Sequence, residues 1–78
     1  MDTTKLTQKI LLEVDCATAM CIIANIQLAT RHRRNIGMSR WIAETFARKL
    51  QEKVIGIMPD QAMVFEMGWN PDYDISDT

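Results

Sequence analysis

The chain has 78 residues, a formal net charge of −1 and 47% hydrophobic residues, which suits one small globular domain. A single core of this size rarely supplies more than about 3–5 kcal/mol of stability, so a second copy, a metal or disulfides are expected to assist it. The soft metal ligands are Cys16, Cys21 and His32, without zinc-type pairing, so we expect no metal, no cofactor and no disulfide, which leaves association.

Charge is distributed unevenly along the chain. Residues 31–53 hold seven cations and two acids, whereas residues 54–78 hold five acids and no cation. A basic centre and an acidic end can neutralise each other within one chain or between two copies. Glu13 and Asp15 interrupt the first apolar stretch, and the uncharged run over residues 16–30 is too short to span a membrane. We therefore expect a cytoplasmic protein that does not interact with membranes.

The first predicted element is a long helix over residues 4–33. A main apolar stripe recurs at three- and four-residue steps, at Leu6, Ile10, Val14, Ala17, Cys21, Ala24 and Leu28. Asp15 borders this stripe and is expected to pair with a basic residue. A second apolar stripe occupies the opposite side and consists of Leu12, Cys16, Met20, Ile23 and Ile26. A helix that is apolar on two faces requires two neighbours.

The next predicted helix covers residues 40–55, after a turn at Asn35-Ile36-Gly37 and with Ser39 as its N-cap. Its apolar stripe, which consists of Ile42, Ala43, Phe46, Ala47, Leu50 and Val54, matches the main stripe of the long helix in an antiparallel αα-hairpin. A third, short helix is predicted over residues 59–67, with Pro59 in its first turn and Gly68 at its end. Residues 1–71 then form one helical domain, and residues 72–78 form a flexible acidic tail.

These elements predict an all-α fold and a homodimer. The helix over residues 40–55 is too short to cover the whole of the helix over residues 4–33, and it cannot reach the second stripe on the far side. We expect two copies to pack through that stripe into a dimeric helical bundle, with Leu12, Cys16, Met20, Ile23 and Ile26 as the interface.

The candidate partner site is the basic turn, which holds Arg31, His32, Arg33, Arg34 and Arg40. One interpretation is that these cations only complement the negative end of a helix and keep the turn soluble. The other is that they bind carboxylates or phosphates, which guanidinium groups fit well. Trp41 and Arg48 share one side of the second helix and extend this site, since an exposed tryptophan beside arginine is typical of a binding hot spot.

No glycine-rich phosphate loop, zinc-protease motif or paired nucleophile and base is present, so we expect neither an enzyme nor a small-molecule substrate. The sequence predicts a small interaction or regulatory protein whose basic turn binds an acidic protein surface. The alternative is a nucleic-acid-binding module that uses residues 31–40 and the second helix. The overall acidity and the scarcity of aromatic residues near the turn favour the protein partner.

Overall fold

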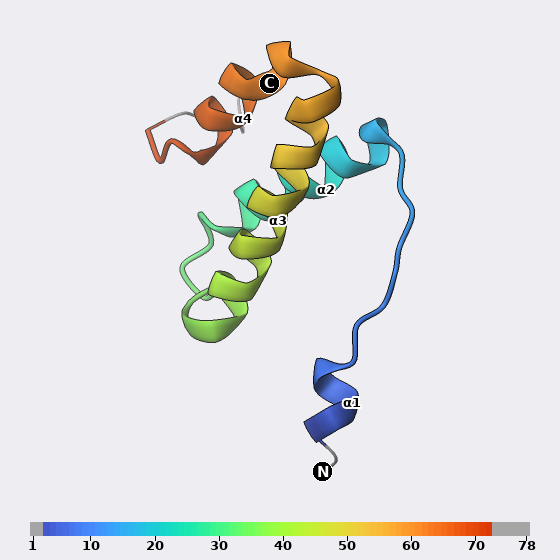
Figure 1. Cartoon of the computed structure of the whole chain (residues 1–78). Helices are drawn as coiled ribbons and strands as arrows, with labels where there is room; N and C mark the ends of the chain where they lie inside the picture. The colour runs from blue at the N-terminus through green and yellow to red at the C-terminus, as the bar shows by residue number, and fades with distance from the viewer. Residues whose placement is uncertain (1–2, 73–78) are drawn as a thin grey trace.

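The computed structural model describes residues 3–72, and these contain helices and connecting segments without a strand (Figure 1). The α-helices are α1 (Thr3–Thr7), α2 (Cys16–Ala29), α3 (Gly37–Ile57) and α4 (Ala62–Trp69), and a 3-10 helix, η1 (Pro59–Gln61), precedes α4. The predicted all-α class is confirmed for these residues. The predicted acidic tail, apart from Asp72, lies outside the described residues.

The predicted single helix over residues 4–33 is wrong, because α1 ends at Thr7, residues 8–15 are extended, and α2 begins only at Cys16. Asp15 causes the break. Its backbone is extended (φ −80°, ψ 170°), and its carboxylate accepts a hydrogen bond from the Thr18 N–H at 2.7 Å. This N-cap geometry satisfies a free N–H of the first turn and places a negative charge at the positive end of the helix. Asp15 therefore starts α2 instead of pairing with a basic residue.

The capping bond also makes α2 sensitive to acid. Hydrogen bonds from the backbone N–H and, secondarily, the side chain of Thr18 lower the pKa of the Asp15 carboxyl. A carboxyl whose pKa is lowered on folding stabilises the fold above its unfolded-state pKa, and this contribution is lost as the pH falls through the folded-state pKa. We expect helicity to decline below about pH 4 and Asp15→Asn to reduce that decline. Circular dichroism during acid titration measures it, with Glu13→Gln as the control, and identical wild-type and Asp15→Asn curves would contradict this role.

The boundaries of the later helices also differ from those predicted. α3 extends beyond residues 40–55 at both ends, and no side chain caps its start, so the predicted Ser39 cap is wrong. Gly37 has the single positive φ among the described residues (+73°) and turns the chain into α3. Met58 leaves the helical conformation immediately before Pro59. The helix predicted over residues 59–67 corresponds to η1 and α4, and Gly68 lies inside α4 rather than after it.

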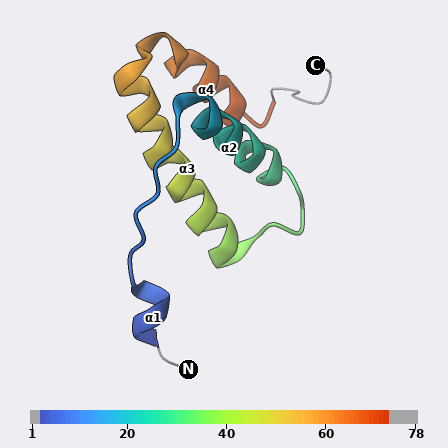
Figure 2. The same cartoon turned by 90° about the vertical axis from the view of Figure 1, so that its right-hand side faces the viewer.

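The core lies where α2, α3 and α4 meet. Its buried apolar side chains are Ala19, Ile23, Ala47, Val54 and Phe65. α2 packs against α3 and α4. The small residues Ala19 of α2 and Ala47 of α3 leave room for larger side chains between these two helices. Figures 1 and 2 show α1 apart from these three helices, at the end of the extended segment. The body of the protein therefore consists of α2, α3, η1 and α4.

The face of α2 that enters this core is the one predicted to form the dimer interface. Ile23 is 0% exposed, and Met20 and Ile26 are partly buried and pack against the core. Cys16 is half-buried, whereas Leu12 lies in the extended segment and is exposed. Burial of the branched and long side chains removes more apolar area from water than burial of Ala17, Cys21 and Ala24 would. The predicted interface through Ile23 is therefore wrong, because the side chain is already covered by its own chain.

Candidate partner site

Residues 30–36, which connect α2 to α3, form the basic loop. Hydrogen bonds fold the start of this loop against the end of α2: the His32 N–H donates to the Ala29 carbonyl at 3.0 Å, and the Asn35 side-chain amide donates to the same carbonyl at 2.9 Å. The Asn35 N–H donates to the His32 carbonyl at 2.9 Å, and His32 Nδ1 accepts from the Arg34 N–H at 3.2 Å. These bonds give the loop a defined shape, and His32 helps to build it.

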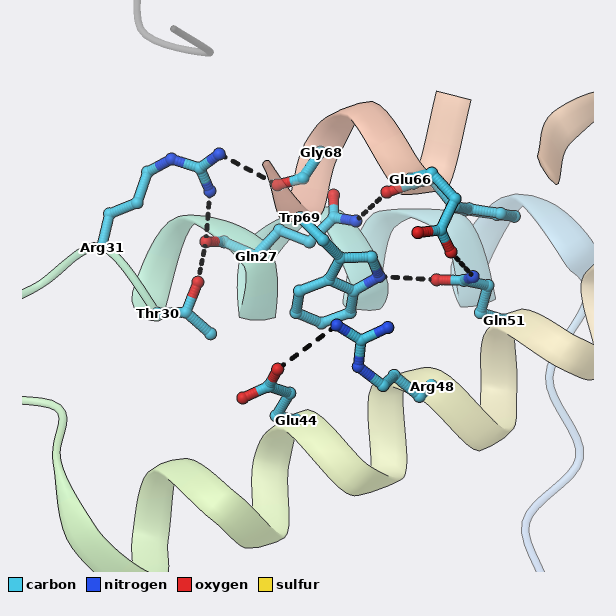
Figure 3. Close-up of polar contacts among 10 residues, drawn as sticks. Gln27, Thr30, Arg31, Glu44, Arg48, Gln51, Glu66, Gly68 and Trp69 are labelled. Atoms are coloured by element: carbon cyan, nitrogen blue, oxygen red, sulfur yellow. Dashed lines mark hydrogen bonds and ion pairs between the residues drawn. The ribbon is translucent and has the colours of Figure 1, made fainter. Parts of the chain in front are cut away.

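The Arg31 guanidinium forms hydrogen bonds to backbone carbonyls of its own chain. Nη1 donates to the Gln27 carbonyl at 2.8 Å, and Nη2 donates to the carbonyls of Gly68 and Asn70 at 3.0 and 2.8 Å. Figure 3 shows Arg31 joining the end of α2 to the end of α4. The structure thus gives this predicted partner-site residue an internal role, which the charge pattern of residues 31–40 does not reveal.

Arg48 is also engaged within the chain. Its guanidinium lies over the Trp69 ring, 4.4 Å from the ring centroid, and forms an ion pair with Glu44 at 3.4 Å (Figure 3). Trp69 Nε1 in turn donates to Gln51 Oε1 at 2.6 Å, and Gln51 Nε2 donates to Glu66 at 3.2 Å. Arg48 therefore helps to hold the end of α4 against α3 and does not extend the Trp41 side as an independent binding group.

The remaining predicted residues stay on the surface. Trp41 is 63% exposed, and within residues 3–72 the side chains of Arg33, Arg34 and Arg40 form no hydrogen bond or ion pair. Large apolar side chains at Ile36 and Met38 are exposed between them in the sequence. We call the set Arg33, Arg34, Ile36, Met38, Arg40 and Trp41 the Trp41 surface. It covers the end of the basic loop and the first two turns of α3.

The Trp41 surface combines cationic and apolar side chains. The unpaired guanidinium groups can each donate several hydrogen bonds to an anion, and the start of α3 contributes a partial positive charge. Trp41, Ile36 and Met38 add apolar area, which a bound protein can cover. No group of three histidine, cysteine, aspartate or glutamate side chains that could hold a metal ion occurs among the described residues. Cys16 and Cys21 are free thiols.

Sequence reasoning missed the residues that fix α4 in place. Gln27 and Gln51 are nearly fully buried, and the Gln27 amide donates to the Phe65 carbonyl at 2.9 Å. A glutamine within an apolar stripe can indicate a buried amide. The spacing of the sequence does not indicate the hydrogen-bond partner of Gln27, which lies 38 residues away. Within the described part of the chain, no helix combines the length and apolar character needed to cross a bilayer. No protein family model matches the chain, and no curated protein or solved structure shows a significant similarity to it.

Proposed function

We propose that the chain is a small, non-catalytic interaction or regulatory protein whose Trp41 surface binds an acidic protein partner. The observation that carries this proposal is that Trp41 is exposed and that Arg33, Arg34 and Arg40, which are close to it in the sequence, have no internal partner among the described residues. In this proposal α2, the basic loop and α3 act as a helical hairpin that presents the surface at its turn. The free cysteines suit the reducing cytoplasm.

The exposed apolar side chains favour a protein over a nucleic acid as the partner. Ile36 and Met38 flank the arginines with apolar area that a phosphate backbone would not cover. In a helix-turn-helix protein, α3 would be the recognition helix, and its side chains after Trp41 would contact a groove of DNA. Glu44 and Thr45 are only half-exposed, and Arg48 is held by Trp69 and Glu44. Nucleic acid binding through the same loop is the outcome against which the proposal is tested.

The test is a pull-down from native cell extract with the immobilised chain, with and without nuclease. We expect bound protein that survives nuclease treatment and is lost with Trp41→Ala, since truncation of a hot-spot tryptophan weakens binding by about thirtyfold or more. Met63→Ala is the matched control, because Met63 is a large apolar residue that is at least as exposed as Trp41 but lies on α4. Arg33→Ala with Arg34→Ala should weaken binding to a smaller extent and should reduce its dependence on salt.

The opposite results are equally clear. If nuclease removes the bound material, and affinity for an oligonucleotide falls about tenfold or more over a modest rise in salt, the alternative of nucleic acid binding is correct. If Trp41→Ala and Met63→Ala behave alike, the Trp41 surface is not the partner site.

A homodimer is the second part of the proposal, on a surface other than the buried face of α2. A chain of this size gains stability from a partner, and an exposed apolar face of α3 remains available for one.

A further inference from the structure

α3 has an exposed apolar face that adjoins the side carrying its core residues Ala47 and Val54. Ile42, Phe46 and Ile57 are exposed there, although the sequence pattern predicts the first two to be buried, and Leu50 is half-buried between them. Residues 8–15, which we call the arm, border this face. Together they enclose a groove of about 470 Å³ that is lined by Phe46 and Leu50 of α3, Ile22 of α2, and Ile10, Leu11, Leu12 and Val14 of the arm. Lys49 and Lys53 are the charged residues of the lining.

The apolar side chains of the arm and its backbone polar groups have few partners within the described chain. Leu11 is 102% exposed, as much as a leucine in an open peptide, and Ile10 and Leu12 are also largely exposed. Residues 9–14 form no backbone hydrogen bond within the described chain. Three consecutive large apolar residues in water, with free backbone groups, are typical of a segment that another chain covers.

Charge indicates what that other chain is. Glu13 follows Leu11 by two residues in the arm, and the pocket that Glu13 lines in its own copy also contains Lys53. Glu13 is exposed and has no ion pair among the described residues, and the same holds for Lys49 and Lys53 on α3. The arm thus offers an apolar side chain followed by an acid, and the groove offers apolar walls with two lysines. The two surfaces are complementary, and every copy of the chain carries both.

We propose that two copies form a dimer by reciprocal arm exchange, in which each arm keeps its place at the border of its own groove while its Leu11 side chain enters the groove of the other copy. Leu11 of each arm lies between Phe46 and Leu50 in the groove of the other copy, and Glu13 lies beside Lys49 and Lys53 there. The contact is isologous, so each interaction occurs twice. Since each groove is bordered by the arm of its own copy, the two arms run side by side, and their free N–H and C=O groups can pair across the two-fold axis. This deepens the homodimer part of the proposed function and makes no use of the Trp41 surface.

Sedimentation equilibrium of the full chain at micromolar concentrations gives the first test. We expect a dimer whose dissociation constant rises about tenfold or more with Leu11→Ser, because the side chain would leave an apolar groove. Met63→Ser is the control, since Met63 is exposed on α4 and outside the groove. Circular dichroism should give the same helicity for both variants, because neither residue belongs to the core.

A charge exchange tests whether the arm crosses between copies. Glu13→Lys alone places three lysines together at each contact, and Lys49→Glu with Lys53→Glu places three glutamates there, so each variant alone is expected to be monomeric where the wild type is dimeric. In an equimolar mixture, each arm of one variant meets an oppositely charged groove of the other at both contacts. We therefore expect the mixture to recover the dimer as a heterodimer.

Three results would overturn the proposal. They are a monomeric wild-type chain at the highest concentration tested, a Leu11→Ser dimer as tight as that of Met63→Ser, and a variant mixture that stays monomeric. The last result would show that Glu13 meets the lysines of its own copy only. A monomer that still bound its acidic partner through Trp41 would refute arm exchange and leave the proposed partner site intact, so the two failures are distinguishable.

Discussion

Ile23→Ala is expected to lower the free energy of unfolding by about 2–5 kcal/mol. Ile23 is the largest fully buried side chain and sits among Ala19, Ala47, Val54 and Phe65, where the loss of three carbons leaves a cavity. Because a domain of this size has only about 3–5 kcal/mol of stability, much of the population should unfold at room temperature. Urea denaturation followed by circular dichroism measures the effect. Ile23→Val, with an expected loss of about 0.5–1.5 kcal/mol, keeps the measurement possible if the alanine variant does not fold.

The dependence of the stability loss on protein concentration shows whether Ile23 lies in the core of its own chain or at a subunit interface. If Ile23 belongs to the core of its own chain, the difference between variant and wild type is the same at every concentration. Val64→Ala is a suitable control, because Val64 is exposed on α4, outside the core and the groove, and should cost less. If the loss instead disappeared at high concentration, Ile23 would be part of the subunit interface that the sequence pattern predicts, and the described core would be wrong.

Gly68→Ala is expected to destabilise the protein by about 1–3 kcal/mol, although alanine is the better helix former. A Cβ at position 68 would overlap the side-chain amide of Gln27, which is buried and donates to the Phe65 carbonyl. Either that hydrogen bond breaks or α4 moves away from α2. Movement of α4 would also separate Arg31 from the Gly68 carbonyl, so the two contacts that hold this helix fail together.

Gly56→Ala is the matched control with the opposite sign. Gly56 lies inside α3, is exposed, and has no atom within 4 Å of the position that a Cβ would take. We expect a gain of about 0.5–1 kcal/mol there, because alanine loses less backbone entropy on entering a helix. Thermal denaturation of both variants gives the comparison. Two glycine variants that change stability in the same direction would contradict the close packing of α4 on Gln27.

The sequence predicts the later helices well and the first helix poorly. Gly37, Met58 and Pro59 lie close to where α3 begins and ends, so the predicted boundaries err by only two or three residues. In the first half, periodicity continues from Leu6 to Leu28 and hides the break over residues 8–15. The local signal for that break is an aspartate three residues before Thr18, which is N-cap spacing, but the same residue also fits the border of a helical stripe.

The choice of buried face could not be made from periodicity. Both sides of α2 are apolar, and only tertiary contacts show that the side with Ile23 packs inward. A polar residue at Gln27 obscures this side in the sequence, because glutamine is counted as a surface residue until its partner is known. Its bond to Phe65 and the bonds of Arg31 to Gly68 and Asn70 join segments 37–39 residues apart. The charge pattern therefore finds the basic loop, but not which arginine the fold uses internally.

The guanidinium of Arg31 has a mechanical consequence. It forms hydrogen bonds to the last turn of α2, to Gly68 in the last turn of α4 and to Asn70 just after α4, so it links the ends of the two helices. The loop that follows Arg31 cannot tilt as a free hinge, since any swing near this residue would pull on the end of α4. The start of the basic loop and the end of α4 are therefore expected to move together.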